Sequence, residues 1–242
     1  MSKSYDKDPI GQRMKQYEHV YTSDCVEKKT PVVIRIDGKA FHTYTKGFEY
    51  PFDEDITYAM DKTTEYLVKN VQNCCIGYTQ SDEISLILLD DKNEHSEQMF
   101  GNKIQKLASV TASMATAIFN QVIKDRTSTT KLAMFDSRIF NVPKEDLGNY
   151  MLWIHRDCIK NSVSMYARTV YSHKELYKQG KADMIEMIET AFNEGRCDRT
   201  WHNLPYRFRY GIVMTSKDGR HFPKEDWTYY TWNNVINQYY ED

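Results

Sequence analysis

The chain has 242 residues, of which 40% are hydrophobic and 27% are charged, and its formal net charge at pH 7 is −2. This composition is typical of a folded globular protein and excludes an intrinsically disordered chain. The small net charge also excludes a global attraction for nucleic acid, so a polyanionic partner would need a local basic patch.

The first half of the chain alternates between helix and strand patterns. Residues 9–23 have the spacing of a short amphipathic helix, and residues 31–37, PVVIRID, form a β-branched run that leads into Gly38. Residues 39–52 mix aromatic and polar side chains, which predicts a short strand and a loop. Asp53 is placed to cap a helix that runs to about residue 71.

Two apolar runs then predict a hairpin. CCIGYT at 74–79 and ISLILL at 84–89 are separated by four polar residues. A long helix is expected from about residue 96 to 124, followed by a strand in FDSRIFNVP at 135–143. The order strand, helix, hairpin, helix, strand predicts an α+β fold with the ferredoxin-like βαββαβ core that polymerase palms and nucleotidyl cyclases use.

The second half of the chain has a different character. Residues 144–195 predict two or three helices, RFRYGIVMTS at 207–216 predicts a strand, and a polar, aromatic tail follows. The sequence has no internal repeat and no low-complexity linker. We therefore predict a palm-like catalytic core with its N-terminal helix over residues 1–143. A helical lobe with a closing strand and tail, residues 144–242, is expected to pack on that core as one unit.

Two carboxylates mark the expected functional edge of the sheet. The first strand ends at Asp37 and the hairpin turn carries Asp82, so both lie at one edge if these strands are neighbours. With Gly38 free to turn its carbonyl inward, these hard oxygen ligands suit Mg²⁺, which would also cancel the repulsion between Asp82 and Glu83. Asp-Gly is also a common turn dipeptide, so the spacing alone equally fits two solvated turns.

The amino-acid sequences of these segments resemble motifs of the tRNA-histidine guanylyltransferase family. RIDGKAFHTYTKGF and YTQSDEISLIL match its patterns R-[LI]-D-G-R-x-F-H and Y-x-Q-S-D-E-x-S, with F-x-x-P between them. FDSRIFNVP, WIHRDCIKNSVS and LPYRFRYGIVM resemble further family segments in the same order, so the resemblance covers nearly the whole chain. It implies a palm-like enzyme that uses two Mg²⁺ ions, ATP and GTP to add nucleotides to the 5′ end of tRNA. It also implies a homo-oligomer and favours a tetramer.

The resemblance assigns roles by position. The implied catalytic residues are Asp37, Asp82 and Glu83, and the implied metal ligands are Asp37, Gly38 and Asp82. The implied nucleotide-binding residues are Asp37, Gly38, Lys39, Ala40, Phe41, His42, Ser81, Asp82, Lys103 and Lys106. The two lysines would neutralise triphosphate charge, a role that suits the compact charge of lysine.

A local basic excess in the second half favours an RNA partner. Residues 152–181 contain six lysines and arginines against two acidic residues. We expect Arg156, Lys160 and Asn161 to bind RNA, although an ordinary solvated helix face would also fit the charge pattern.

Two departures bear on the branch of the family. Ile159 stands where members specialised for tRNA-histidine carry a histidine, and Tyr50 replaces the lysine of F-x-K-P. Both favour the guanylyltransferase-like branch, which restores truncated 5′ ends by pairing any of the four nucleotides with the template. Dedicated addition of G to tRNA-histidine is the alternative. Two other readings are a nucleotidyl cyclase, for which the hairpin lacks a GGDEF pattern, and a non-catalytic RNA-binding protein, which would be expected to lose Asp37 or Asp82.

Other site classes find little support in the sequence. The five cysteines form no CxxC pair and the seven histidines form no HxxxH pair, which argues against a disulfide framework and a zinc site. No apolar run reaches the length of a membrane span, and the first ten residues lack the apolar core of a signal peptide. We therefore expect a cytoplasmic protein without a membrane partner.

Overall fold

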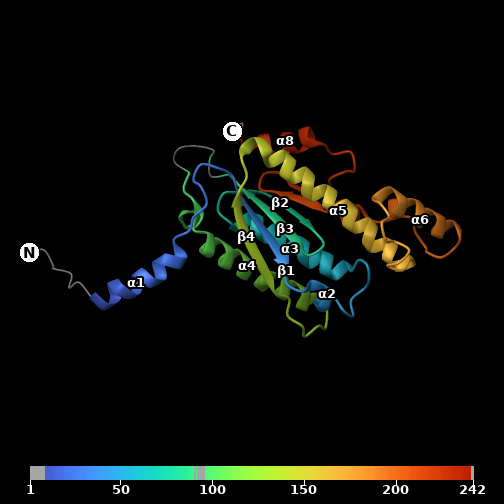
Figure 1. Ribbon diagram of the computed structural model, residues 1–242, viewed down its shortest axis with the longest axis horizontal. Helices are drawn as coiled ribbons and strands as arrows, with labels where there is room; N and C mark the ends of the chain where they lie inside the picture. The colour runs from blue at the N-terminus through green and yellow to red at the C-terminus, as the bar shows by residue number, and fades with distance from the viewer. Residues whose placement is uncertain (1–8, 90, 92–95, 241–242) are drawn as a thin grey trace, which may run out of the picture.

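A single antiparallel sheet with helices on both faces organises the molecule (Figure 1). The computed structural model describes residues 9–89, 91 and 96–240, and the first eight residues, where we expect no signal segment, lie outside them. In these ranges the strands lie in the order β4 (Phe135–Asn141), β1 (Val32–Gly38), β3 (Glu83–Leu88), β2 (Cys74–Gln80), β5 (Ile212–Thr215) and β6 (Gly219–His221).

One face of the sheet is covered by α3 (Glu54–Asn70) and α4 (Ile104–Arg126). Alternate apolar residues of β1 and β3, such as Ile34 and Leu86, are fully buried in the core beneath these helices. Asp53 caps α3 as predicted, because its carboxylate accepts hydrogen bonds from the first free backbone N–H groups of the helix. The helix predicted to follow Asp53 is confirmed.

The other face is covered by α5 (Leu147–Val170) and α8 (Tyr229–Asn237). Val33 and Tyr78 of the sheet pack here with Met151 of α5 and Trp232 of α8. The far part of α5 extends past the end of the sheet and packs with α6 (Lys181–Asn193), as Figure 1 shows. A third apolar cluster around Trp201 fills this region.

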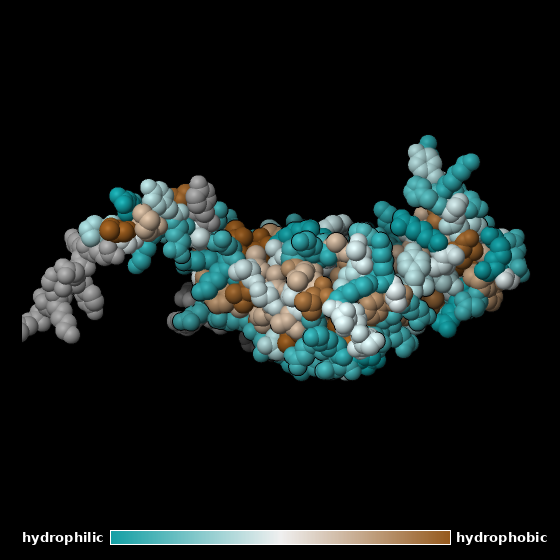
Figure 2. Space-filling model, turned by 90° about the horizontal axis from the view of Figure 1, so that it is seen from below, coloured by the Kyte–Doolittle hydropathy of each residue, from teal (hydrophilic) through white to brown (hydrophobic). Residues whose placement is uncertain are grey.

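The predicted α+β fold is confirmed. The elements β1, α3, β2, β3, α4 and β4 follow each other in the ferredoxin-like βαββαβ order. Residues 144–242 add α5, α6 and α8, and they also add β5 and β6 to the same sheet, where β5 pairs with β2. The N-terminal helix is also present as α1 (Pro9–Thr22), and it projects from the body with exposed apolar side chains (Figure 2).

Residues 39–52 do not contain the predicted strand. The chain enters the left-handed region at Ala40, with φ of 50°, and forms the four-residue helix α2 (Phe41–Tyr44). Phe41 and Tyr44 are three residues apart, so on a helical turn both rings reach the ring of Phe119, with centroids 5.7 and 5.8 Å away. The aromatic spacing that suggested a strand therefore serves one face of a helix.

Two other predicted boundaries are wrong, and the tail contains a helix that was not predicted. The strand expected from residue 207 begins only at Ile212, because Tyr206–Tyr210 form the short helix α7. Gly211 separates the two with φ of 71°, and a Cβ there would lie 2.7 Å from the carbonyl oxygen of Thr79, so a side chain does not fit. The long helix expected from residue 96 begins at Ile104, after the short helix η1 (Met99–Asn102), and the tail contains α8.

The other short helices are η2 (Lys144–Asp146) and η3 (Trp201–Asn203). None of the helices in the described ranges is long and apolar enough to cross a membrane.

Candidate active site

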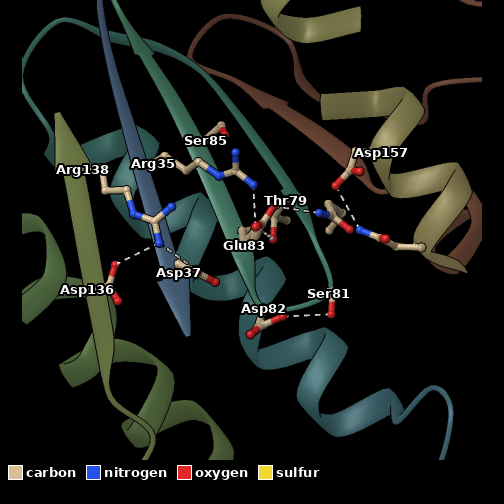
Figure 3. A network of polar contacts seen from close by, with 12 residues as sticks. Arg35, Asp37, Thr79, Ser81, Asp82, Glu83, Ser85, Asp136, Arg138 and Asp157 are labelled. Carbon is tan, nitrogen blue, oxygen red and sulfur yellow. Dashed lines mark hydrogen bonds and ion pairs between the residues drawn. The ribbon is translucent and has the colours of Figure 1, made fainter. Parts of the chain in front are cut away.

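The two predicted carboxylates meet at one end of the sheet. β1 and β3 are antiparallel neighbours with Asp37 opposite Glu83, and Asp82 occupies the tight turn between β2 and β3. A Cβ on Gly38 would lie 3.0 Å from the Cβ of Asp82 and would overlap the Phe41 ring, so only glycine lets the turn approach this closely. Figure 3 shows the two side chains at the same end of neighbouring strands.

The electrostatic environment disfavours negative charge on both carboxylates. Burial, with smaller contributions from Asp37 and Glu83, raises the pKa of Asp82 to about 6, although the Ser81 hydroxyl donates a hydrogen bond to it at 3.0 Å. Burial, Glu83 and Asp136 raise the pKa of Asp37 above its ordinary value. Arg138 opposes this shift, with its Nη2 only 3.2 Å from Asp37 Oδ2. A bound cation would lower the pKa of both carboxyl groups and so favour their charged forms.

Glu83 has a different environment from its neighbour Asp82. Arg35 Nη2 donates to its Oε1 at 2.5 Å (Figure 3). Gln80 Nε2 donates to its Oε2 at 2.9 Å. Both carboxylate oxygens are therefore already engaged by protein groups. The structure assigns Glu83 an anchoring contact with Arg35 and does not place it as a free ligand or proton acceptor beside Asp37.

A pocket of about 590 Å³ opens next to this pair of carboxylates. Its walls come from α2 and the loop after it, the β2–β3 turn, α5 and α7. Six of the residues expected to bind nucleotide line it, whereas Asp37 and Lys39 do not. The six are Gly38, Ala40, Phe41, His42, Ser81 and Asp82.

Sequence reasoning missed the aromatic wall of this pocket. Phe52 stacks on Phe208, with ring centroids 4.3 Å apart and an interplanar angle of 16°. Next to them, Arg207 Nε donates to Asp61 Oδ1 at 2.7 Å, and its Nη2 has no hydrogen-bond partner among the described residues. These residues come from segments far apart in sequence, so no local spacing could reveal the wall. The basic and aromatic residues of LPYRFRYG at 204–211 were the only sequence signal for this wall of the pocket.

Within one chain, the predicted triphosphate residue Lys103 lies near the end of β1 that is opposite to Asp37. Lys103 forms an isolated β-bridge with Cys25. Two residues further along, the Glu27 N–H donates a hydrogen bond to Asn141 Oδ1, and Asn141 lies opposite Val32 in the sheet. Val32 begins β1 and Asp37 lies near its other end, so the two regions are separated by roughly 17 Å at about 3.3 Å per residue. Lys106 lies over the ring of Phe100, 4.7 Å from its centroid. The contact of these two lysines with a triphosphate stays a prediction.

The three residues expected to bind RNA separate into two groups. Arg156 and Lys160 are exposed and lie one turn apart on α5. Asn161 instead lines the pocket, and its Nδ2 donates to Asp157 Oδ2 at 3.0 Å. Ile159 is only 3% exposed and packs with the apolar cluster around Trp201. It therefore presents no side chain to a bound RNA.

A divalent cation would have to be held by few protein ligands. Among the described residues, no group of three or more His, Cys, Asp and Glu side chains is arranged to bind a metal ion. Two carboxylates of raised pKa, beside a glycine that lets the Asp82 turn approach closely, nevertheless suit a hard cation that completes its shell with water and phosphate oxygens.

Comparison with known proteins places the chain in a family. The model of tRNAHis guanylyltransferase (Thg1) matches residues 11–143. The tRNA(His) guanylyltransferase of Saccharomyces cerevisiae is 28% identical over 225 residues, which cover 84% of this chain and 89% of the yeast protein.

Two solved structures of bacterial tRNA(His) guanylyltransferase-like proteins are also similar. The one in complex with ATP is 39% identical with a TM-score of 0.79, and the match covers 85% of this chain and 86% of that chain. The one in complex with GTP is 34% identical with a TM-score of 0.72, and the match covers 91% and 88% of the two chains. The family model spans more than half of the sequence, and both the fold and the enzyme class agree with it. The chain belongs to the tRNA-histidine guanylyltransferase family and is a nucleotidyltransferase.

Proposed function

We propose that this protein repairs 5′-truncated tRNA by adding nucleotides in the 3′-5′ direction, each chosen by pairing with the opposite strand. The observation that carries the proposal is the meeting of Asp37 and Asp82 at the mouth of a nucleotide-sized pocket, in a chain of this family. The similar bacterial structures in complex with ATP and GTP support nucleoside triphosphates as substrates.

Asp37, Asp82 and the backbone carbonyl of Gly38 would hold two Mg²⁺ ions. When bound, such ions neutralise phosphate charge and increase the nucleophilicity of a nearby hydroxyl. The raised pKa values of both aspartates support this assignment, since the paired carboxylates are poorly compensated by the protein itself. Glu83 contributes indirectly, by fixing Arg35 and the end of β3 on which Asp82 sits.

The residues of the pocket would hold the nucleoside while the chemistry takes place at its mouth. In activation, the tRNA 5′-phosphate attacks the α-phosphate of ATP or GTP and pyrophosphate leaves. In the second step, nucleotide addition, the 3′-hydroxyl of the incoming nucleotide attacks the activated 5′-phosphate and loses its proton, and the nucleoside monophosphate leaves. The stacked Phe52 and Phe208 offer the apolar wall for a base, and His42 and Asn161 offer polar groups beside it.

The burial of Ile159 supports the template-directed branch. A side chain inside the apolar cluster neither donates nor accepts hydrogen bonds to RNA, so this position cannot read tRNA-histidine identity. When the template base supplies the hydrogen bonds, the protein needs only to fix shape and phosphates. Dedicated addition of G to tRNA-histidine is the competing function.

Assembly and location form part of the same proposal. The exposed apolar residues Ile10, Met14 and Tyr17 on the projecting α1 support a homo-oligomer, and the family resemblance favours a tetramer. None of the five cysteines, all of which lie in the described ranges, forms a disulfide, which supports a reducing compartment such as the cytoplasm.

The decisive experiment is nucleotide addition to tRNAs that lack their first nucleotide, in Mg²⁺ and ATP, with each nucleoside triphosphate supplied alone. The added nucleotide should change when the opposite base is changed, across several tRNA species, and addition should stop once the acceptor stem is full. Addition of G to tRNA-histidine alone, whatever the opposite base, would show that the competing function is correct.

A further inference from the structure

Trp153 on α5 is exposed in an unusual way. Its side chain is 54% exposed, whereas Trp201 and Trp232 are fully buried. The ring is nevertheless fixed in place, because the Arg35 guanidinium lies 5.3 Å from its centroid and the Tyr150 ring lies 5.9 Å away. An exposed indole held against two neighbours is a rigid apolar surface that costs little entropy to use in binding.

The contacts of Trp153 reach the strand ends that carry the proposed catalytic carboxylates. Arg35 precedes Asp37 by two residues on β1 and donates to Glu83, the neighbour of Asp82, at 2.5 Å. Arg35 thus bridges the indole and the strand that carries the β2–β3 turn. This chain of contacts places Trp153 on the α5 side of the sheet, beside the proposed reaction centre.

Basic residues flank the ring on the protein surface. Arg156 and Lys160 follow Trp153 along α5 and are exposed. Arg138 on the edge strand β4 is 59% exposed while it pairs with Asp37 and Asp136. The nearest acidic group on α5, Asp157, is engaged by Asn161. An aromatic ring between cations is the arrangement with which proteins bind unpaired nucleotides, because every base has a face that can stack and every phosphate a negative charge.

We propose that Trp153 is the stacking platform for the template base of the acceptor stem, the base left unpaired where the first nucleotide is missing. Arg35, held by Glu83, is the positioning residue that keeps the indole in the stacking orientation. The inference rests on the proposed function, since it assigns a binding surface for the tRNA of that reaction. The surrounding positive charge favours RNA over an apolar protein surface as the occupant.

The test compares tRNA binding and nucleotide binding in Trp153→Ala and Trp153→Phe. Trp153→Ala should weaken the affinity for 5′-truncated tRNA about tenfold, which is the usual size for loss of one base–aromatic contact, while KM for ATP stays unchanged. Trp153→Phe should recover most of the affinity. Tyr230→Ala is the matched control, because Tyr230 is an aromatic residue on α8 that is 76% exposed and lies outside the proposed surface.

A tRNA with an abasic site at the template position completes the test. The wild-type protein and Trp153→Ala should bind this tRNA equally, because the partner of the indole is absent. Arg35→Lys, which keeps the charge but loses the planar contact, should raise KM for tRNA and leave KM for ATP unchanged. Equal loss of affinity for the intact and abasic tRNAs, or a raised KM for ATP with normal tRNA affinity, would overturn the inference.

The two proposals fail in distinguishable ways. If the wild-type protein extends truncated tRNA and Trp153→Ala binds it normally, the stacking platform is wrong and the proposed function stands. If the wild-type protein neither binds nor extends truncated tRNA, the proposed function is wrong and the stacking platform is rejected with it.

Discussion

The two ends of β1 differ in how their polar groups are satisfied. At the start of the strand, Asn141 donates to the carbonyl oxygens of Glu27, Thr30 and Pro31 and accepts from the Glu27 N–H. At the other end, Asp37 and Asp82 are brought together, and Arg138, the Ser81 hydroxyl and, more weakly, Arg35 and a backbone N–H compensate them only in part. The first arrangement closes the fold, whereas the second leaves charge that a ligand can satisfy.

The same contrast separates the adjacent carboxylates of the hairpin. Glu83 has both oxygens engaged by Arg35 and Gln80, and Asp82 has one hydroxyl donor and a raised pKa. Glu83 therefore stabilises the fold, whereas its sequence neighbour Asp82 belongs to the candidate site. The comparison teaches that incomplete satisfaction of a buried charge distinguishes the functional residues more sharply than their residue type does.

The largest expected effect comes from removing charge at the incompletely satisfied end. Asp37→Asn and Asp82→Asn should each lower nucleotide addition roughly a thousandfold, about 4 kcal/mol in activation free energy, while tRNA affinity stays near normal. Single-turnover addition to a 5′-truncated tRNA measures the loss. Asp136→Asn is the matched control, since this carboxylate also lies near Arg138 but is 57% exposed. Near-normal turnover in either variant would remove the basis for a metal site here.

An intermediate effect is expected on the exposed face of α5. Replacing both Arg156 and Lys160 by alanine should weaken tRNA binding about tenfold at low salt and flatten its salt dependence, because two phosphate contacts are lost. Binding titrations over a range of salt concentrations measure the slope. A slope identical to that of the wild-type protein would show that these two residues do not contact the tRNA backbone.

A smaller effect on stability should follow from the raised pKa of Asp82. Because its pKa is about 6 in the fold and about 3.9 in the unfolded chain, ionisation destabilises the fold as the pH rises through this window. In EDTA, Asp82→Asn should therefore be more stable than the wild-type protein above pH 6, by on the order of 1 kcal/mol after allowance for solvent screening. The difference should disappear below about pH 3, where the Asp82 carboxyl is protonated in both the folded and the unfolded chain. Urea unfolding at pH 7.5 and about pH 3 measures both values, and a gain that is equal at the two pH values would contradict this origin.

The smallest effect is expected at the end of β1 that lies far from the pocket. Lys103→Ala and Lys106→Ala should change KM for ATP and GTP by less than about twofold if each site is built from one chain. Steady-state kinetics with both nucleotides checks this, and Lys124→Ala on the last turn of α4 provides a lysine control. A large rise in KM would instead show that the lysines of one chain serve the site of another.

The sequence by itself determined the order of the core elements and the two motifs that carry Asp37 and Asp82. Helix periodicity, the Asp53 cap and the alternation of β1 are local signals, because each depends on residues a few positions apart. The hairpin likewise follows from a short polar break between two apolar runs. The meeting of the carboxylates could then be deduced once β1 and β3 were assumed to be neighbours.

Which polar residues are satisfied and which are left for a ligand depends on contacts between segments that are distant in sequence. The pairing of Arg35 with Glu83, the stack of Phe52 on Phe208 and the position of Lys103 far from Asp37 all join or separate segments distant in sequence. Such contacts depend on strand order and on how each helix crosses the sheet, and the residue spacing within one segment contains no information about either. The same reason explains α7, where Gly211 must pass beside the backbone of β2 and the chain cannot remain extended through residues 207–211.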